Sequence, residues 1–179
     1  MSGRLDGGSQ GAEVPASPVP ERASTRLNVY ADEPWDRTAE KMRVRTRLFG
    51  MPLGAKELGA SLHELLPGST GFNLHAHYGM EELFFVLSGT PTLRTADGEE
   101  ELAPGDVVFC PRGLAGLHTF TNPTDSPARV LAVSTLPLPE VVVYPEIGKV
   151  GVVTRNPMEP APEGEDQGIV AMFDMPPEK

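Results

Sequence analysis

Three of the four histidines in the chain, together with one glutamate, form a pattern that could hold a metal ion. His75 and His77 are separated by one residue, Glu82 follows after four intervening residues, and His118 comes about forty residues further on. Side chains alternate between the two faces of a β-strand, so His75 and His77 would point the same way, with Cα atoms roughly 6.5–7 Å apart. Three imidazole nitrogens and one carboxylate oxygen suit Fe, Mn, Ni, Cu, Co or Zn. The sequence therefore predicts one divalent transition metal ion per chain.

The segments around these residues are typical of short antiparallel strands. A short turn follows His77, and the apolar run 83–87 is the expected return strand, with Glu82 at its start. His118 lies beside Phe120 in a second hairpin-like block. An isolated His-x-His pair is more often a hydrogen-bonded polar pair than a metal site, so the prediction depends on all four residues being brought together.

The rest of the chain also predicts many short strands joined by turns. The 19 glycines and 19 prolines make up about a fifth of the chain, which is high for a helical protein and natural for an all-β fold. No internal repeat and no confident long helix is visible. Strands are expected at residues 42–48, 60–66, 83–87, 91–95, 99–102, 107–110, 129–135, 141–144 and 149–153.

The spacing of the first ligand group resembles the first motif of the cupin superfamily. That motif reads Gly, five residues, His-x-His, three or four residues, Glu, six residues, Gly. His75, His77, Glu82 and Gly89 fit it, whereas the position of the opening glycine is occupied by Ser69. The resemblance implies an all-β fold, the cupin-type jelly-roll β-barrel or double-stranded β-helix, as in small single-domain bacterial cupins.

The second cupin motif is similar to residues 105–122. It reads Gly, five residues, Pro-x-Gly, two residues, His, three residues, Asn, and the chain supplies Gly105, Pro111, Gly113, His118 and Asn122. The loop between Gly113 and His118 is longer than the motif by two residues. The resemblance implies that the metal ligands are His75, His77, Glu82 and His118.

The composition along the chain divides it into three parts. Residues 1–25 are rich in Gly, Ser and Pro, cannot bury enough apolar surface to offset the entropy of ordering, and are expected to be a disordered lead. Residues 26–153 are expected to form a single cupin barrel with an N-terminal docking segment that carries Tyr30 and Trp35. Residues 154–179 are expected to form a Pro-rich, acidic tail. Within it, the apolar segment 169–173 is expected to pack against the barrel as a strap.

The alternation of faces also predicts which side chains surround the metal. If the ligands point inward, the cavity should be mostly apolar, with a few polar groups, and suited to a small organic ligand. Its expected lining includes Asn73, Phe84, Val86, Phe120 and Asn122.

Three further polar residues are assigned from their positions. Tyr78 and Glu81 lie at the turn near the metal and are candidate proton donors or gates. His63 shares a strand with leucines and is expected to be a packed core histidine.

The same alternation leaves an apolar stripe on the outside of the barrel, formed by Phe72, Leu74, Leu83, Phe85 and Leu87. Such a stripe is unusual on a lone barrel in water. We therefore expect another protein surface to cover it, and a homodimer is the expected form, since cupins commonly pair through such faces.

Charge and cysteine content exclude several classes of partner. The net charge of −10 disfavours binding to nucleic acid or to an anionic membrane. The chain has no apolar run of about 18 residues, and its N-terminus lacks the charged-then-apolar order of a signal peptide. The single cysteine excludes an internal disulfide and fits a reducing, cytoplasmic location.

The resemblance leaves more than one function open. Four ligands on an octahedral metal leave two positions for a substrate, water or dioxygen, which favours a metal-dependent enzyme acting on a small organic substrate. A dioxygenase-like reaction is the leading expectation, and lyase, isomerase and decarboxylase chemistry are alternatives. The alternative from another class is a non-catalytic binding or sensing cupin with a structural metal. A seed-storage-like structural barrel is weaker, because such proteins have two barrels.

Overall fold

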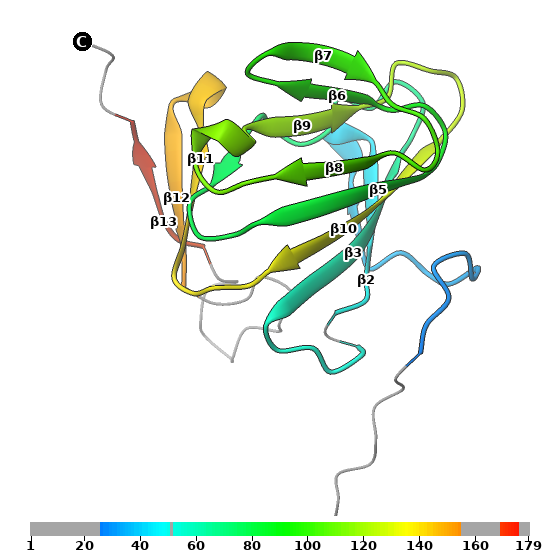
Figure 1. Ribbon diagram of the computed structural model, residues 1–179, viewed down its shortest axis with the longest axis horizontal. Helices are drawn as coiled ribbons and strands as arrows, with labels where there is room; N and C mark the ends of the chain where they lie inside the picture. Colours follow the sequence, from blue (N-terminus) through cyan, green and yellow to red (C-terminus); the bar gives the residue numbers. More distant parts are fainter. Residues whose placement is uncertain (1–25, 51, 155–168, 176–179) are drawn as a thin grey trace, which may run out of the picture.

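Two facing β-layers make up the part of the chain that the computed structural model describes, which is residues 26–50, 52–154 and 169–175 (Figure 1). The first layer is a six-stranded antiparallel sheet. Its strands lie in the order β1 (Arg37–Ala39), β2 (Val44–Leu48), β3 (Leu58–Leu65), β10 (Ala128–Thr135), β5 (Glu82–Ser88) and β8 (Val107–Cys110).

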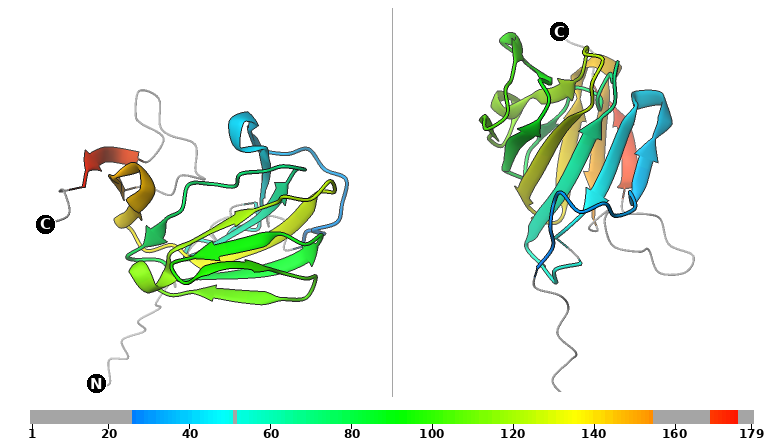
Figure 2. Two further views of the ribbon diagram at one scale, coloured as in Figure 1. Left: turned by 90° about the horizontal axis from the view of Figure 1, so that it is seen from above. Right: turned by 90° about the vertical axis from the view of Figure 1, so that its right-hand side faces the viewer.

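The second layer is built from two smaller sheets. One has the order β13 (Ile169–Asp174), β12 (Lys149–Val153), β11 (Glu140–Tyr144) and β4 (Ala76–His77). The other has the order β7 (Gly98–Glu101), β6 (Thr92–Thr95) and β9 (His118–Thr121). A single bridge between His75 and His118 connects the two. Figure 2 shows this arrangement from above and from the side.

This architecture confirms the predicted all-β jelly-roll barrel. Sequence-distant strands lie side by side, as when β10 pairs with both β3 and β5. Three short 3-10 turns complete the described elements: η1 (Glu40–Met42), η2 (Leu114–Gly116) and η3 (Pro145–Ile147). No helix in the described part of the chain is long and apolar enough to cross a membrane.

The apolar core lies between the layers and contains side chains from both. Phe84 and Val86 of β5 pack with Phe120 of β9 and Val130 of β10, and each of these side chains is at most 9% exposed. Burying a side chain of this kind contributes about 1.5–3 kcal/mol relative to leaving it in water. The inward positions of these strands are therefore the main source of barrel stability.

One expected strand begins later than the sequence predicts. Residues 40–42 form η1, and Arg43 has a left-handed backbone with φ of 56°. Extended pairing therefore starts only at Val44, although the alternation of apolar and basic residues begins at Met42.

The N-terminal docking segment lies against the first layer. The guanidinium of Arg47, on β2, is buried and donates hydrogen bonds to the backbone carbonyls of Asn28, Val29 and Ala31 at 2.6–3.2 Å. Arg129 lies over the indole of Trp35, 5.9 Å from the ring centre. The proposed lead, residues 1–25, lies outside the described residues. At the other end, the expected strap 169–173 falls within β13, which pairs with β12.

The predicted outer stripe is wrong at two positions. Leu74 is buried at 6% exposure, and Phe72, although 37% exposed, lines the cavity with its ring against that of His63. Strict alternation fails here because residues 70–75 are not a regular strand and β4 begins only at Ala76. On β5 the outward residues are as expected, and Leu83 faces Phe109 across the β5–β8 pair.

Asn122 stabilises the barrel rather than the cavity. Its side chain is fully buried; the amide nitrogen donates to the carbonyls of Leu65 and Ser126, both at 2.8 Å, and the oxygen accepts from Thr124. It thereby fastens the end of β3 to the loop after β9.

The Asn122→Ala variant should lower the free energy of unfolding by about 2–4 kcal/mol, because two carbonyls lose their donor and each unsatisfied buried group costs about 1–3 kcal/mol. Denaturant titration followed by circular dichroism measures this change. Thr124→Val removes only the hydroxyl contacts and should cost less than about 1.5 kcal/mol. Equal losses in the two variants would contradict this role of Asn122.

Candidate metal centre

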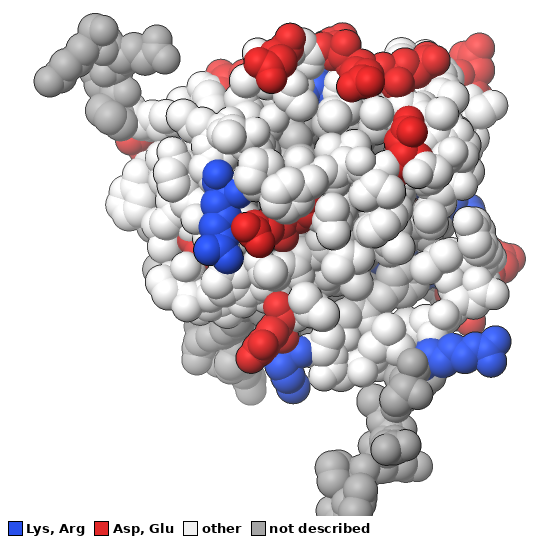
Figure 3. All heavy atoms as spheres, viewed as in Figure 1, with Lys and Arg blue, Asp and Glu red and all other residues white. Residues whose placement is uncertain are grey.

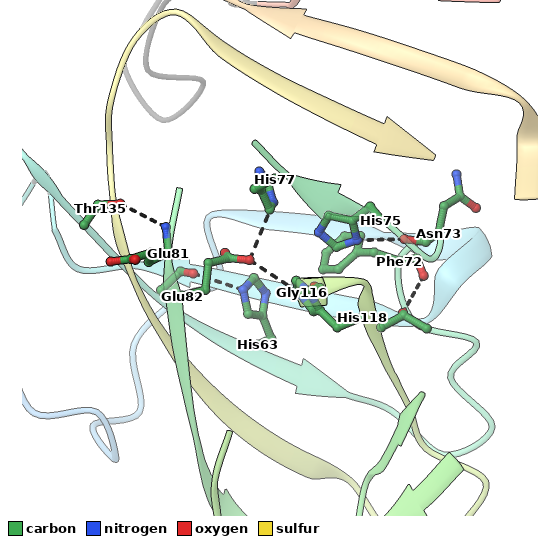
Figure 4. Close-up of polar contacts among 12 residues, drawn as sticks. His63, Phe72, Asn73, His75, His77, Glu81, Glu82, Gly116, His118 and Thr135 are labelled. Carbon is green, nitrogen blue, oxygen red and sulfur yellow. Dashed lines mark hydrogen bonds and ion pairs between the residues drawn. The ribbon is translucent and has the colours of Figure 1, made fainter. Parts of the chain in front are cut away.

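The four predicted ligands come from both layers and lie near one another in the wall of an interior cavity (Figure 4). His77 ends β4, and His75 lies immediately before that strand. His118 opens β9 in the same layer, and Glu82 opens β5 in the opposite layer. The jelly roll therefore brings together residues that are far apart in the chain.

Three of the four predicted ligands offer atoms that are close enough for one ion. His75, His77 and Glu82 each offer an atom within 4.8 Å of the other two. His118 joins this group through Glu82, because its Nε2 lies 3.3 Å from the Glu82 Oε2. The Nε2 of His77 lies 3.5 Å from the same oxygen. The site thus gathers all four predicted residues around the Glu82 carboxylate.

Each imidazole is held so that its Nε2 faces the shared point. The Nδ1 of His75 lies 2.8 Å from the carbonyl of Asn73, and that of His118 lies 2.8 Å from the carbonyl of Gly116. A carbonyl can only accept, so each Nδ1 carries the proton and each Nε2 keeps its lone pair. The His77 Nδ1 contacts the Glu140 carboxylate at 3.3 Å in the same manner. This carboxylate–histidine arrangement is usual behind metal-ligating histidines.

Glu140 is a functional residue that sequence reasoning missed. It opens β11 and is completely buried. A Cβ on Gly79 would lie 2.2 Å from the Glu140 Oε2, so the absence of a side chain at Gly79 lets the turn pass close to this carboxylate. Burial raises the pKa of Glu140, while the backbone N–H groups at the turn after His77 lower it. No motif signals Glu140, because 63 residues separate it from His77 and only the β4–β11 pairing brings them together.

The electrostatics of the site favour a cation. Burial, reinforced by neighbouring imidazoles, lowers the pKa of His77 to about 3 and that of His118 to about 4. Burial also lowers the pKa of His75. Burial and then the Glu140 carboxylate raise the pKa of Glu82 to about 7. The imidazoles are therefore neutral near pH 7, and a charge on Glu82 is costly to keep without a counter-ion.

The Glu82 Oε2 gives the clearest test of whether a metal fits. This atom is buried and has no hydrogen-bond donor, although two imidazole nitrogens approach it. Those nitrogens cannot donate to it, because their protons are on Nδ1. When Glu82 is ionised, lone pairs therefore face a carboxylate oxygen, and a transition metal ion bound by these four residues satisfies all of them.

The longer loop of the second motif does not move His118 away. Residues 114–116 close as the turn η2, and a Cβ on Gly116 would lie 1.9 Å from the carbonyl of Pro111. The two additional residues are absorbed in this tight turn. His118 is 2% exposed and packs against Phe84, with ring centres 5.0 Å apart.

The metal centre opens into a cavity of about 750 Å³ between the layers. Of the predicted lining residues, Asn73, Phe84 and Phe120 line it, as do Tyr144 and His63. Tyr144 was not predicted; its ring stacks on His75 with centres 5.9 Å apart. The expectation that His63 is simply a packed core residue is incomplete, because its ring is part of the cavity wall.

Four other predicted residues are not part of this lining. Val86 packs in the apolar core at 2% exposure, and Asn122 holds the barrel as described above. Tyr78 is half exposed, and Glu81 is exposed, turned away from the histidines and held through its backbone by Thr135 (Figure 4). Both residues follow His77 in a turn, where side chains no longer alternate between two faces as they do in a strand.

Glu140→Gln should weaken metal binding by about 10–100-fold, since the neutral amide orients and polarises the His77 imidazole less effectively. Titration calorimetry with Zn²⁺ measures the affinity. Glu81→Gln is the matched control, because it removes an exposed carboxylate nearby and should leave the affinity unchanged. If both variants bind Zn²⁺ as tightly as the wild type, Glu140 has no such role.

Comparison with known proteins agrees with the fold. A cupin domain matches residues 61–134 of the chain. A crystal structure described as a sugar phosphate isomerase of the cupin superfamily from Silicibacter pomeroyi is 26% identical, with a TM-score of 0.64 over 74% of this chain and 76% of that one. A protein from Acidithiobacillus ferrooxidans, provisionally described as a sugar phosphate isomerase, is 28% identical, with a TM-score of 0.58 over 62% and 70% of the two chains.

A search of the curated proteins gave no match. The sequence match, the double-layered barrel and the ligands on two linked motifs nevertheless agree with one another. The chain therefore contains a cupin domain, which the family match places at residues 61–134.

Proposed function

We propose that the protein is a metal-dependent enzyme that acts on a small organic substrate bearing at least one oxygen that can reach the metal. The observation that carries this proposal is the buried Glu82 Oε2, which has no hydrogen-bond donor and is approached by the unprotonated Nε2 atoms of His77 and His118. The centre faces a cavity large enough for a small molecule.

A bound divalent metal supplies Lewis acidity toward a substrate oxygen. The protein's own side chains supply the surroundings. Phe84, Phe120 and Met80 form apolar walls that exclude water and strengthen electrostatic interactions at the centre. Tyr144 lies in the wall beside His75; burial raises its pKa, so its hydroxyl stays protonated and can donate to a substrate oxygen.

We infer a reaction of the isomerase or lyase class ahead of the dioxygenase reaction expected from the ligand set. Both structures described above carry sugar phosphate isomerase in their descriptions, and both exceed 25% identity with this chain. This similarity supports Lewis-acid chemistry that does not consume dioxygen. A cytoplasmic location fits the single, buried and unpaired cysteine, Cys110.

His77→Ala should remove most turnover while the barrel still melts near the wild-type temperature, because the core strands do not depend on the ligand. Metal analysis of protein purified without chelator comes first, followed by a substrate screen of sugar phosphates, α-hydroxy ketones and hydroxy acids, with and without dioxygen. Turnover should persist anaerobically and vanish after chelation.

Two outcomes would change the proposal. Turnover that stops when dioxygen is removed would establish a dioxygenase. No turnover, combined with a melting temperature several degrees lower in His77→Ala than in the metal-loaded wild type, would indicate the alternative of a non-catalytic binding cupin with a structural metal.

We further propose that the protein is a homodimer that pairs through the outer face of β5 and β8. Val107 and Phe109 are each 56% exposed and pair in register with Phe85 and Leu83. This side of the molecule has few charges, whereas acidic residues gather over the β6–β7 hairpin at its upper edge (Figure 3). Two copies can therefore meet here without opposing their net charges of −10 directly.

Phe109→Asp should convert the dimer to a monomer, because it places a charge within the apolar contact. Light scattering should give twice the chain mass of 19.2 kDa for the wild type and that mass for the variant. Phe173→Asp is the control, since Phe173 is equally exposed, at 56%, but lies on β13. A monomeric wild type would reject the proposal.

A further inference from the structure

A second group of polar side chains lies in the cavity wall, apart from the metal ligands. It consists of Thr46 on β2 with Ser61 and His63 on β3. Thr46 Oγ1 lies 3.1 Å from the His63 Nδ1, and Ser61 Oγ lies 3.0 Å from its Nε2. Thr46 and Ser61 are buried, at 6% and 8% exposure. We call these three residues the hydroxyl–imidazole cluster.

The strand register keeps the cluster together and gives it apolar neighbours on one side. Thr46 faces His63 across the β2–β3 pair. On the other side of β3, Ser61 faces Ala132 and His63 faces Val130, and both partners also line the cavity. The cluster is therefore a polar patch with apolar neighbours on the β10 side and Arg37 opposite Thr46 on the β1 side. The contacts between these three side chains leave each hydroxyl with further hydrogen-bonding capacity toward the cavity that it lines.

The cluster offers one donor and one acceptor to that partner. Burial, and then the nearby His75, lower the pKa of His63 to about 4, so the imidazole is neutral near pH 7. A neutral imidazole donates at one nitrogen and accepts at the other. The hydroxyl that accepts from the ring keeps its own proton for a ligand, and the hydroxyl that donates to the ring keeps a lone pair. Either tautomer gives the same uncharged pair of functions.

The register also gives the distance from the cluster to the metal centre. Ser61 faces Ala132, which faces Phe84, and Glu82 lies two residues from Phe84 on the same face of β5. Two strand spacings and two residues of rise separate the Cα atoms of Ser61 and Glu82 by roughly 12 Å. A short-chain molecule bound to the metal at one end can therefore reach the cluster with its other end.

We propose that the hydroxyl–imidazole cluster binds the distal end of the ligand whose other end reaches the metal, and that this distal group is an uncharged hydroxyl or carbonyl. The inference rests on the proposed metal-dependent function and adds the chemical class of the substrate's far end. A carboxylate or phosphate is a poor match, because none of the three cluster residues carries a positive charge and Arg37, the cation that faces Thr46 across the β1–β2 pair, already has a partner. Thr46, Ser61 and His63 are thus specificity-determining residues.

The test uses hydroxamates, which bind a metal ion at one end. Linear alkyl hydroxamates of increasing length are prepared with a hydroxyl, a methyl or a carboxylate at the far end, and their affinity for the Zn²⁺-loaded protein is measured by calorimetry. At the matching length the wild type should prefer the hydroxyl over the methyl terminus about tenfold, the scale of one hydrogen bond to a buried group. The carboxylate should bind most weakly.

The double variant Thr46→Val, Ser61→Ala should lose this preference and keep its affinity for the methyl-terminated series. Ser134→Ala, which removes another cavity hydroxyl outside the cluster, should retain the preference. Thermal melting checks that each variant is folded. The inference is overturned if the wild type shows no preference for the hydroxyl over the methyl terminus at any chain length. It is also overturned if the double variant keeps that preference. Absence of Zn²⁺-dependent hydroxamate binding in every protein would instead overturn the proposed function itself.

Discussion

The approach of unprotonated imidazole nitrogens to a buried carboxylate oxygen is the interaction around which the structure is arranged. His77 and His118 present lone pairs to the Glu82 Oε2 at 3.5 and 3.3 Å, and no donor in the described part of the chain satisfies that oxygen. In a buried setting this grouping is unfavourable by itself. A divalent cation turns it into a favourable one, so the same geometry that costs stability without metal creates affinity for metal.

The supporting contacts explain how the barrel holds that arrangement. The carbonyls of Asn73 and Gly116 fix two imidazoles through Nδ1, and Glu140 fixes the third. The tight fit of Gly79 against Glu140 and of Gly116 against Pro111 leaves these partners little freedom to move. Orientation of the ligands is therefore provided by backbone shape and by residues behind the centre.

The polar and apolar groups of the cavity wall determine which ligand can bind beside the metal. Its apolar walls lower the local dielectric near the centre, and polar groups occur at defined places: Tyr144 beside His75, and the hydroxyl–imidazole cluster further along the first layer. A molecule that binds here has to present an oxygen to the metal and apolar surface to the walls. Specificity in such a site depends on the few polar groups, because an unpaired one is costly to bury.

The sequence by itself determined the fold class and indicated four candidate ligands, because strand-length apolar runs, turn residues and ligand spacing are local properties. It also located most strands to within a residue or two. Only the tertiary structure decided that Glu140 and Tyr144 belong to the site, that Val86 and Asn122 do not line the cavity, and that His63 does. Alternation predicts directions within a regular strand and fails in the irregular segment before β4, where Phe72 and Leu74 were assigned outward. Contacts such as that between His77 and Glu140 depend on which strands pair, and pairing across 63 residues is set by the packing of the whole barrel.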